Sequence, residues 1–300
     1  MFNTRRVFEQ GWPVRVMLRI GRYLPRWGAG MAAAVGARVI LWLKLDVYHG
    51  ARMNLRHVVG PDMSERELRQ ILTRLFVHLV RRYYELFYNL GRGRREIATF
   101  TPAVRFTAQS QAYIAQALER GRGLFLLACH TANFDMAGIA VAQYMPVPLL
   151  VLSLATPSLD MEMMNDLRRE CGAQMTPVSP EALRQAMGYL RQGHAVVTGA
   201  DYPVRGADAP VTFFGAPAYL PTGYLRIPLR TGSPVMVLTT HYEDGVYWLH
   251  TTPPMDLEKT GDRQHDVAVN MRRILDVVET FIGQHPEEWM MFLPVWEEAT

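Results

Sequence analysis

The sequence has few cysteines and no long unbroken apolar run, and each shortage excludes a class of protein. Only two cysteines, Cys129 and Cys171, occur among 300 residues, so neither a framework of disulfides nor a cluster of cysteine metal ligands can form. The most apolar long stretch, residues 27–43, is interrupted by Arg38. It is shorter than the roughly 20 apolar residues that a membrane-spanning helix needs. We therefore expect no metal and no bound cofactor, and a single membrane span is disfavoured.

Several signatures of function are also missing from the sequence. Residues 1–12 contain no continuous apolar segment followed by a small-residue cleavage site, so no signal peptide is evident. No Gly-x-Ser-x-Gly segment is present, which counts against a serine hydrolase. No recognised nucleic-acid motif accompanies the basic residues, and no internal repeat occurs. Nearly half of the residues are hydrophobic and a fifth are charged, which is typical of a globular protein.

The positive charge is concentrated at the N-terminal end. Residues 1–60 contain ten Lys/Arg and two acids, a net charge of +8, whereas the whole chain carries +4. Large apolar residues such as Trp12, Ile20 and Trp27 alternate with these cations. This mixture favours an anionic membrane surface over a nucleic-acid groove. We expect residues 1–60 to form a basic, amphipathic, membrane-associated region, in which residues 13–46 make one or two helices lying on or dipping into the bilayer.

The remainder, residues 61–300, has the pattern of one α/β domain. Ser64-Glu-Arg-Glu67 is a capping box, and the helical spacing of apolar residues then continues to Gly91, with Arg81 and Arg82 expected on the polar face of this helix. From residue 110, apolar strands alternate with helices, which indicates a mostly parallel mixed sheet flanked by helices. Asp244-Gly245 predicts a β-hairpin. The expected strands are 124–129, 148–154, 195–199, 234–242, 246–252 and 288–293, and the expected helices are 111–119, 135–144, 160–171, 180–193 and 266–284.

Residues 124–135 contain the parts of a general base. The apolar strand Leu124–Cys129 ends at His130, and Asp135 follows five positions later. Ligands of open α/β sheets bind where such strands end. If residues 131–135 begin a helix, one hydrogen bond can join Asp135 to His130 and leave the other ring nitrogen free to take a proton. A surface hydrogen bond or a helix cap is the commoner role of such a pair. Cys129 would point to the opposite face and fill the core.

A second group of candidate residues follows the strand at 195–199. Asp201 lies at its end and is either a turn residue or a group that positions His130. Phe213-Phe214-Gly215 is either a buried turn or an apolar wall of a binding site. Thr222 precedes an expected helix whose free amides could hold an anion. Arg205 is a candidate phosphate ligand, although a lone arginine is more often a surface charge.

These ordered segments resemble one protein family. His130-x-x-Asn133-Phe-Asp135 is similar to the His-x4-acid motif of the glycerolipid acyltransferase superfamily. The closest likeness is to the branch of the lipid A late acyltransferases and the mycobacterial phosphatidylinositol mannoside acyltransferases, whose motif commonly has Trp and Glu at the last two positions. Asp201, Phe213-Phe-Gly215-x-Pro and Pro286-Glu-x-Trp289 resemble later segments of the same branch, and the likeness covers most of residues 35–295. The arginine that the family often carries after the second strand is missing, and Arg168 or Arg169 would replace it.

The resemblance implies an acyltransferase that moves a fatty acyl group from a thioester to a hydroxyl of a lipid or glycolipid. His130 and Asp135 would be catalytic. Acyl-CoA or acyl carrier protein would be the co-substrate. The protein would work as a peripheral or monotopic protein on the cytoplasmic face of the inner membrane. A non-catalytic lipid-binding homologue and a thioesterase or hydrolase remain open as alternatives. The residues implied in substrate binding are Asn133, Asp201, Arg205, Phe213, Phe214, Gly215, Thr222 and Arg168.

Overall fold

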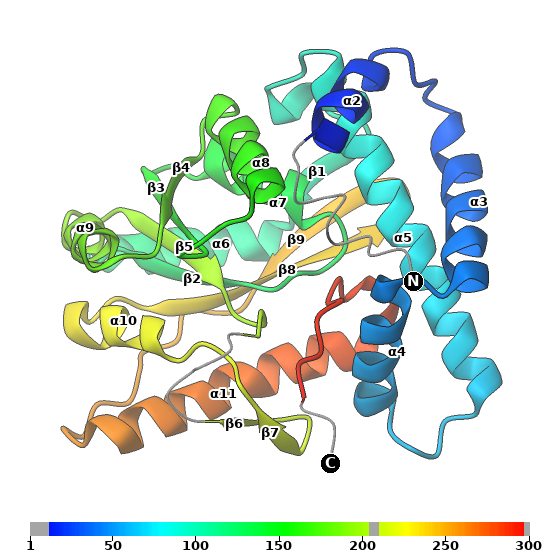
Figure 1. Ribbon diagram of the computed structural model, residues 1–300. Helices are drawn as coiled ribbons and strands as arrows, with labels where there is room; N and C mark the ends of the chain where they lie inside the picture. Colours follow the sequence, from blue (N-terminus) through cyan, green and yellow to red (C-terminus); the bar gives the residue numbers. More distant parts are fainter. Residues whose placement is uncertain (1–11, 204–209, 297–300) are drawn as a thin grey trace.

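The computed structural model describes residues 12–203 and 210–296 (Figure 1). Seven strands form one mixed sheet in the order β1-β9-β8-β2-β5-β3-β4, in which only the β8–β9 pair is antiparallel. The predicted fold class, a mostly parallel sheet flanked by helices, is confirmed. The strands of this sheet are β1 (Ala103–Phe106), β2 (Leu124–Ala128), β3 (Leu149–Ser153), β4 (Gln174–Pro177), β5 (Ala195–Gly199), β8 (Val235–Glu243) and β9 (Val246–Thr251).

Helices cover both faces of the sheet. One apolar core lies between one face and α5–α8, and a second lies between the other face and α9–α11. Alternate residues of β2 serve the two cores: Leu124 and Leu126 face the first, whereas Phe125, Leu127 and Cys129 face the second. The helices are α5 (Glu65–Gly91), α6 (Ala108–Glu119), α7 (Phe134–Tyr144), α8 (Leu159–Glu170), α9 (Pro180–Arg191), α10 (Arg226–Thr231) and α11 (Arg263–Gln284).

The N-terminal helices pack beside the sheet domain on α5. They are α2 (Trp12–Gly21), α3 (Gly28–Leu43) and α4 (Asp46–Val59), and a third apolar cluster joins α3, α4 and α5. The predicted helices within residues 13–46 are thus present. No single helix of the described residues is long and apolar enough to cross a bilayer, although α3 and α4 together pass that test as a pair bent by 88°.

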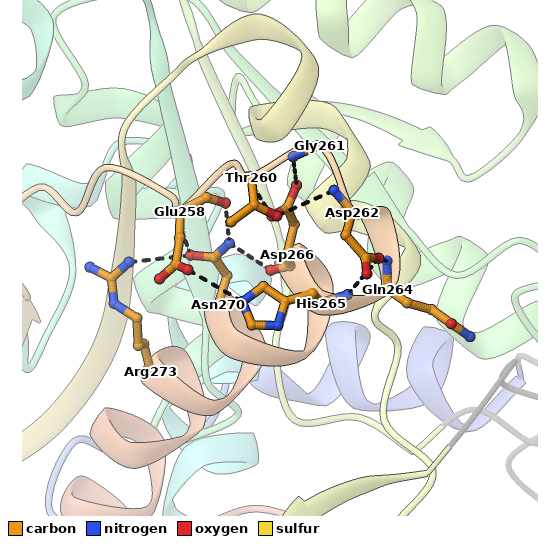
Figure 2. Close-up of polar contacts among 9 residues, drawn as sticks. All are labelled: Glu258, Thr260, Gly261, Asp262, Gln264, His265, Asp266, Asn270 and Arg273. Atoms are coloured by element: carbon orange, nitrogen blue, oxygen red, sulfur yellow. Dashed lines mark hydrogen bonds and ion pairs between the residues drawn. The ribbon is translucent and has the colours of Figure 1, made fainter.

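Local signals account for several element ends. The capping box at Ser64 forms, since Glu67 N–H donates to Ser64 Oγ and Ser64 N–H donates to the Glu67 carboxylate. The β8–β9 turn has positive φ at Asp244 and Gly245, as a type I′ hairpin requires. Figure 2 shows the start of α11, where the Asp262 carboxylate accepts from the amides of Gln264 and His265. Asn270 ties this helix to the segment after β9 through both backbone groups of Glu258.

Other predictions of secondary structure are wrong. The strand expected at 288–293 is instead a short 3-10 helix, η3 (Pro286–Glu288), followed by an extended segment with one isolated bridge, Thr131 to Trp289. The helix expected after Thr222 is a three-residue 3-10 turn, η2 (Gly223–Leu225), that leads into α10. Two short edge strands, β1 and β4, lack a clear apolar pattern and were not expected, nor was the small hairpin of β6 (Val211–Phe213) and β7 (Ala216–Ala218).

Helix α4 fixes the path of the C-terminal segment. The Asn54 side-chain amide donates to the carbonyls of Met291 and Leu293, and its oxygen accepts from Val295 N–H. One turn away, Gly50 lies directly against Phe292: a Cβ built on Gly50 would be 1.8 Å from the Phe292 carbonyl oxygen. Only glycine permits this approach, so the segment after η3 is pinned to α4.

Gly50→Ala should therefore destabilise the protein by about 1–3 kcal/mol, the usual range for overpacking in a well-packed contact. Gly30→Ala is the matched control, because it is also a helical glycine but nothing lies within 4 Å of an added Cβ. It should be neutral or slightly stabilising, since alanine favours helix. Urea unfolding of both variants measures the difference. Equal stability of the two variants would show that the close approach is absent.

Candidate active site

Strand register brings His130 and Asp201 together. Strands β2 and β5 are parallel neighbours with Ala128 opposite Gly199, and each chain continues for two residues to His130 and Asp201. The ring Nδ1 of His130 lies 2.7 Å from Asp201 Oδ1. The backbone N–H of His130 also donates to this carboxylate, at 3.0 Å to Oδ2. The pair therefore forms at the carboxyl ends of two adjacent strands, where the sheet topology reverses direction.

Asp201 is fully buried and has several donors. The indole N–H of Trp289 donates to its Oδ2 at 2.9 Å. Burial raises the pKa of the Asp201 carboxyl, but the His130 ring, its backbone amide and the Trp289 indole together hold that pKa below its usual value. Because an ionised carboxylate only accepts hydrogen bonds, Nδ1 of His130 must carry the proton. Nε2 is then the basic nitrogen of the ring.

The surroundings of the His130 ring leave it partly open. Its side chain is 25% exposed, the Phe134 ring meets it edge-on at 4.8 Å, and Tyr202 lies 5.7 Å away between ring centres. A Cβ added to Gly199 would lie 3.1 Å from Cε1 of the imidazole, so the glycine makes room for the ring. An anchored, solvent-accessible imidazole has the geometry of a general base.

The hydrogen bond predicted between His130 and Asp135 does not form. Both oxygens of Asp135 are taken by arginines: Arg82 donates to Oδ2 through Nε at 2.8 Å and Nη2 at 2.5 Å, and Arg168 donates to Oδ1. Asp135 is buried, and although burial alone would raise its pKa, the two guanidinium groups hold it well below the usual range. Asp135 lies on α7, so its side chain points to α5 and α8 and not to the end of β5.

Arg82 is buried as well, contrary to its expected place on the polar face of α5. Its side chain lies over the Phe134 ring at 3.9 Å and pairs with Asp135. Arg168 is less enclosed, with 21% of its side chain exposed, and also donates to Asn165. Two arginines against one carboxylate leave a net positive charge at the first turn of α7, close to Phe134 and the His130 ring.

A comparison with protein families places nearly the whole chain in one family. A model of the bacterial lipid A biosynthesis acyltransferases matches residues 2–298. The chain belongs to this family. The resemblance inferred from its motifs is therefore confirmed, and the chain is placed among the acyltransferases.

Individual relatives are more distant. The chain is 25% identical to a phosphatidylinositol mannoside acyltransferase of Mycobacterium tuberculosis over 190 residues, which cover 61% of this chain and 58% of that protein. It is 24% identical to the protein of the same name from Mycolicibacterium smegmatis over 191 residues, covering 61% of this chain and 60% of that protein. The match thus spans less than two-thirds of the length of either relative.

The loop that carries His130 is fixed by the C-terminal segment. Met290 N–H donates to the His130 carbonyl and Ala132 N–H donates to the Glu288 carbonyl, both at 2.7 Å. Ala132 has a φ of +46°, which is uncommon for a residue other than glycine. Asn133, a predicted substrate ligand, is fully buried and caps α7 by accepting from Met136 N–H. Its side-chain amide also donates to the Met136 sulfur, and Asn133 hydrogen-bonds the Glu85 carboxyl group.

The Phe213–Gly215 segment is a hairpin turn. Phe214 and Gly215 have positive φ and join β6 to β7, as in a type I′ turn. Phe213 is fully buried against the rings of Trp289 and Trp296. Phe213 therefore supports Trp289, the donor to Asp201, and is not itself at the surface of the site.

The remaining predicted ligands have different positions and partners in the structure. Arg168 lies at the site, bound to Asp135. Thr222 precedes η2 without capping it through its side chain, and a three-residue turn offers no helix terminus for an anion. Arg205 lies outside the described residues. Ala200 N–H, considered as an oxyanion donor, already donates to the Ala128 carbonyl. Cys129 is buried with the pKa of its thiol raised by burial, which opposes a thiolate nucleophile.

The donor that sequence reasoning missed is Trp289. It was noticed as part of a C-terminal motif, but nothing in its local sequence indicated a contact with Asp201, 88 positions earlier. Trp296 provides a natural comparison. It lies in the same aromatic cluster, 6.2 Å from Trp289 between ring centres, and its indole N–H donates to the Phe213 carbonyl.

Trp289→Phe should lower acyl transfer by about tenfold, because hydrogen bonds to charged groups contribute about 1.5–3 kcal/mol. Without the indole donor, the Asp201 carboxylate interacts more strongly with the protonated imidazole of His130, which then holds its proton more tightly. The acid limb of the pH–rate profile should therefore move to higher pH. Trp296→Phe makes the same chemical change without touching Asp201, so it should lower stability and leave the profile in place. Identical profiles for both variants would contradict the role given to Trp289.

A second buried carboxyl group lies beneath the loop. Glu85 accepts a hydrogen bond from the Tyr247 hydroxyl at 2.6 Å. Burial raises the pKa of Glu85 from 4.5 to about 7, and the donors and charge around it do not reverse this shift. A carboxyl whose pKa is raised by folding destabilises the native state once it ionises, so this part of the stability falls as pH rises from about 4.5 to about 7.

Glu85→Gln cannot ionise and should lack this fall. Relative to the wild type, its free energy of unfolding should improve by about 1–3 kcal/mol between about pH 5 and about pH 8. Urea unfolding at the two pH values measures the change. Burial also raises the pKa of Glu288 to about 7. Because Glu288 is present in both proteins, its contribution to the pH dependence of stability cancels in the comparison. A difference that is the same at both pH values would show that Glu85 does not titrate in this range.

Proposed function

We propose that the chain transfers a fatty acyl group from a thioester donor to a hydroxyl of a membrane lipid or glycolipid, with His130 as general base and Asp201 as the carboxylate that orients it. The observation that carries this proposal is the short contact of His130 Nδ1 with a buried, ionised Asp201, which leaves Nε2 as the basic nitrogen. Family membership supports the reaction class.

The proposed reaction proceeds without an enzyme nucleophile. Nε2 of His130 takes the proton of the acceptor hydroxyl while its oxygen attacks the thioester carbonyl. The tetrahedral intermediate then collapses, the carbon–sulfur bond breaks, and the sulfur leaves with the proton held on the imidazole. The products are an ester and a free thiol. Asp201 stabilises the imidazolium that forms between the two steps, a contribution typical of general-base catalysis.

Asp135 has a different proposed role, which is to hold Arg168 at the site. Its carboxylate binds Arg82 and Arg168 together, and the partly exposed Arg168 is a cation that a phosphate group can approach. Acyl-CoA and acyl carrier protein both present their thioester on a phosphate-bearing arm, so either donor suits this cation. Phe214, Gly215, Thr222 and Arg205 remain predicted contributors to substrate binding, and the buried Asn133 and Phe213 are proposed to contribute through the elements that they hold in place.

We further propose that the protein acts at the cytoplasmic face of the inner membrane as a peripheral or monotopic protein. The relatives are named for acylation of a membrane lipid, and the basic amphipathic helices α2 and α3 are the segments proposed to contact the bilayer.

Three substitutions separate the proposed roles. His130→Asn should reduce transfer by at least about 1,000-fold and Asp201→Asn by about 100-fold or more, because the base or its orienting partner is lost, while both proteins stay folded. Asp135→Asn should instead destabilise by about 3–5 kcal/mol, because two buried or partly buried arginines lose their carboxylate.

The assay incubates purified protein with acyl-CoA or acyl carrier protein thioesters and a membrane lipid extract, and mass spectrometry detects acylated lipids. Thermal unfolding of each variant is measured alongside. The proposal would be wrong if folded Asp201→Asn were fully active and Asp135→Asn were inactive but stable. Asp135 would then be the residue that orients His130. Release of free fatty acid without any acylated lipid would favour a thioesterase, and no turnover of any donor would favour a lipid-binding homologue.

A further inference from the structure

Most of the large apolar side chains of helix α3 face away from the protein, although Ile40 and Leu41 pack against the third apolar cluster. Its buried residues are small, namely Gly28, Ala33 and Ala37, and they lie against α5. Trp27 and Trp42, at its two ends, are 73% and 81% exposed. A helix on a soluble protein normally turns its large apolar residues to the core, so this reversed arrangement marks a contact surface.

The exposed residues form a continuous line. Their spacing of three or four positions places them on one face of a helix, and we name this line the outer stripe. In α2, Val16 and Ile20 are exposed with the same spacing, and Tyr23 follows them after the helix ends. The outer stripe consists of Trp27, Met31, Val35, Val39, Trp42 and Leu43.

The charge around the outer stripe has one sign. Residues 12–45 contain six cations and no acid. The arginines of this segment are exposed, and Arg38 is the charged residue within α3 itself. An apolar face bordered only by cations is complementary to an anionic bilayer, in which the apolar side chains enter the headgroup boundary and the cations meet phosphate groups. A second copy of this chain would present the same positive charge and be repelled.

A basic hollow opens at the end of the outer stripe, next to Trp42 and Leu43. Its volume is about 440 Å³, and it lies where the end of α3 meets α4 and the first turns of α5. Leu68 and Leu72 form an apolar floor, and Tyr48 adds a hydroxyl. Its cations are Lys44, Arg52, Arg66 and Arg69.

Three of these four cations, among them Lys44, have no acidic partner within the described residues. Glu65, the acid in the lining, binds Arg52 at 3.0 Å and Arg56 at 2.5 Å. Within the described residues, no ion pair joins Arg66 or Arg69 to a carboxylate, and both side chains are exposed. The hollow therefore keeps a positive charge above an apolar floor, which matches a phosphate group attached to a lipid.

We propose that the outer stripe lies in the interface of an anionic bilayer and that the basic hollow binds the phosphate of one lipid headgroup. This inference rests on the membrane location proposed above but not on the transfer chemistry. The hollow is separate from the active site, because Arg69 and Arg82 are about 20 Å apart along α5 at 1.5 Å per residue. In this proposal the bound lipid is an anchor for the protein, distinct from the acyl acceptor.

Vesicle flotation of the purified full chain tests the proposal, with vesicles of phosphatidylcholine alone or of equal parts phosphatidylcholine and phosphatidylglycerol. Arg66→Gln/Arg69→Gln should weaken binding to the anionic vesicles by about 30-fold, the factor expected for two lost interfacial cations, with little change on the neutral ones. Val35→Gln/Trp42→Gln should weaken binding to both vesicle types by more than about tenfold, because apolar contact with the bilayer is lost.

The matched control is Arg191→Gln/Arg263→Gln, which removes the same charge from exposed positions on α9 and α11. Figure 1 shows α9 at the opposite side of the molecule from α3, and at that separation salt screens the membrane field. This control should change binding by less than about threefold. An equal loss in the control and in Arg66→Gln/Arg69→Gln would overturn the headgroup site, since general attraction would then explain the binding.

Two further measurements distinguish membrane docking from the transfer mechanism and from self-association of the chain. His130→Asn should bind vesicles as the wild type does, so a failure of the transfer mechanism would leave the docking surface intact. Analytical ultracentrifugation in the absence of lipid examines the competing occupant. If Val35→Gln/Trp42→Gln converts a dimer to a monomer and still binds vesicles normally, the outer stripe is a subunit interface and the proposal is wrong.

Discussion

The buried carboxylate of Asp201 is the group around which the site is arranged. An ionised carboxylate without water is costly unless donors surround it. Asp201 receives donors from the His130 ring, the His130 backbone and the Trp289 indole. These groups come from the ends of β2 and β5 and from the segment after η3. The orientation of the His130 imidazole is therefore tied to the packing of three separate parts of the chain.

A second carboxylate divides the work with the first. Asp135 occupies the acid position of the His-x4-acid motif, but its partners are Arg82 and Arg168. The same buried region thus contains two ionised carboxylates with different partners, one an imidazole and the other a guanidinium pair. The two carboxylates have partners of different electrostatic behaviour, because arginine stays charged at any physiological pH whereas histidine changes charge near neutrality. Asp135 can hold a permanent positive charge in place, whereas Asp201 can stabilise a proton that the imidazole gains and loses.

Much of the fold could be predicted from local patterns, and the limits of that prediction have physical causes. The capping box at Ser64, the Asp244-Gly245 turn and the alternation after residue 110 depend on near neighbours, and these predictions are confirmed. The pairing of His130 depended on strand order. Asp201 lies nearer to His130 than Asp135 does only because β5 is placed beside β2. Sequence spacing alone favours Asp135, which is five positions from His130.

The C-terminal segment was the least predictable part for a related reason. Its apolar residues suggest a strand, yet Asn54 and the His130 loop take its backbone hydrogen bonds. Arg82 looked like a surface residue because its helix has a polar face there, and its buried partner lies 53 positions away. Edge strands β1 and β4 are short and half-exposed, so their residues do not alternate clearly enough to be recognised.

The position of Trp289 also sets an order of events during synthesis. His130 and Asp201 leave the ribosome well before Trp289, and the backbone partners of the His130 loop, Glu288 and Met290, arrive with it. Until then the strands can pair, but the carboxylate lacks its indole donor and the loop lacks its two backbone contacts. A nascent chain therefore acquires a complete site only when its last segment is translated and docks on α4.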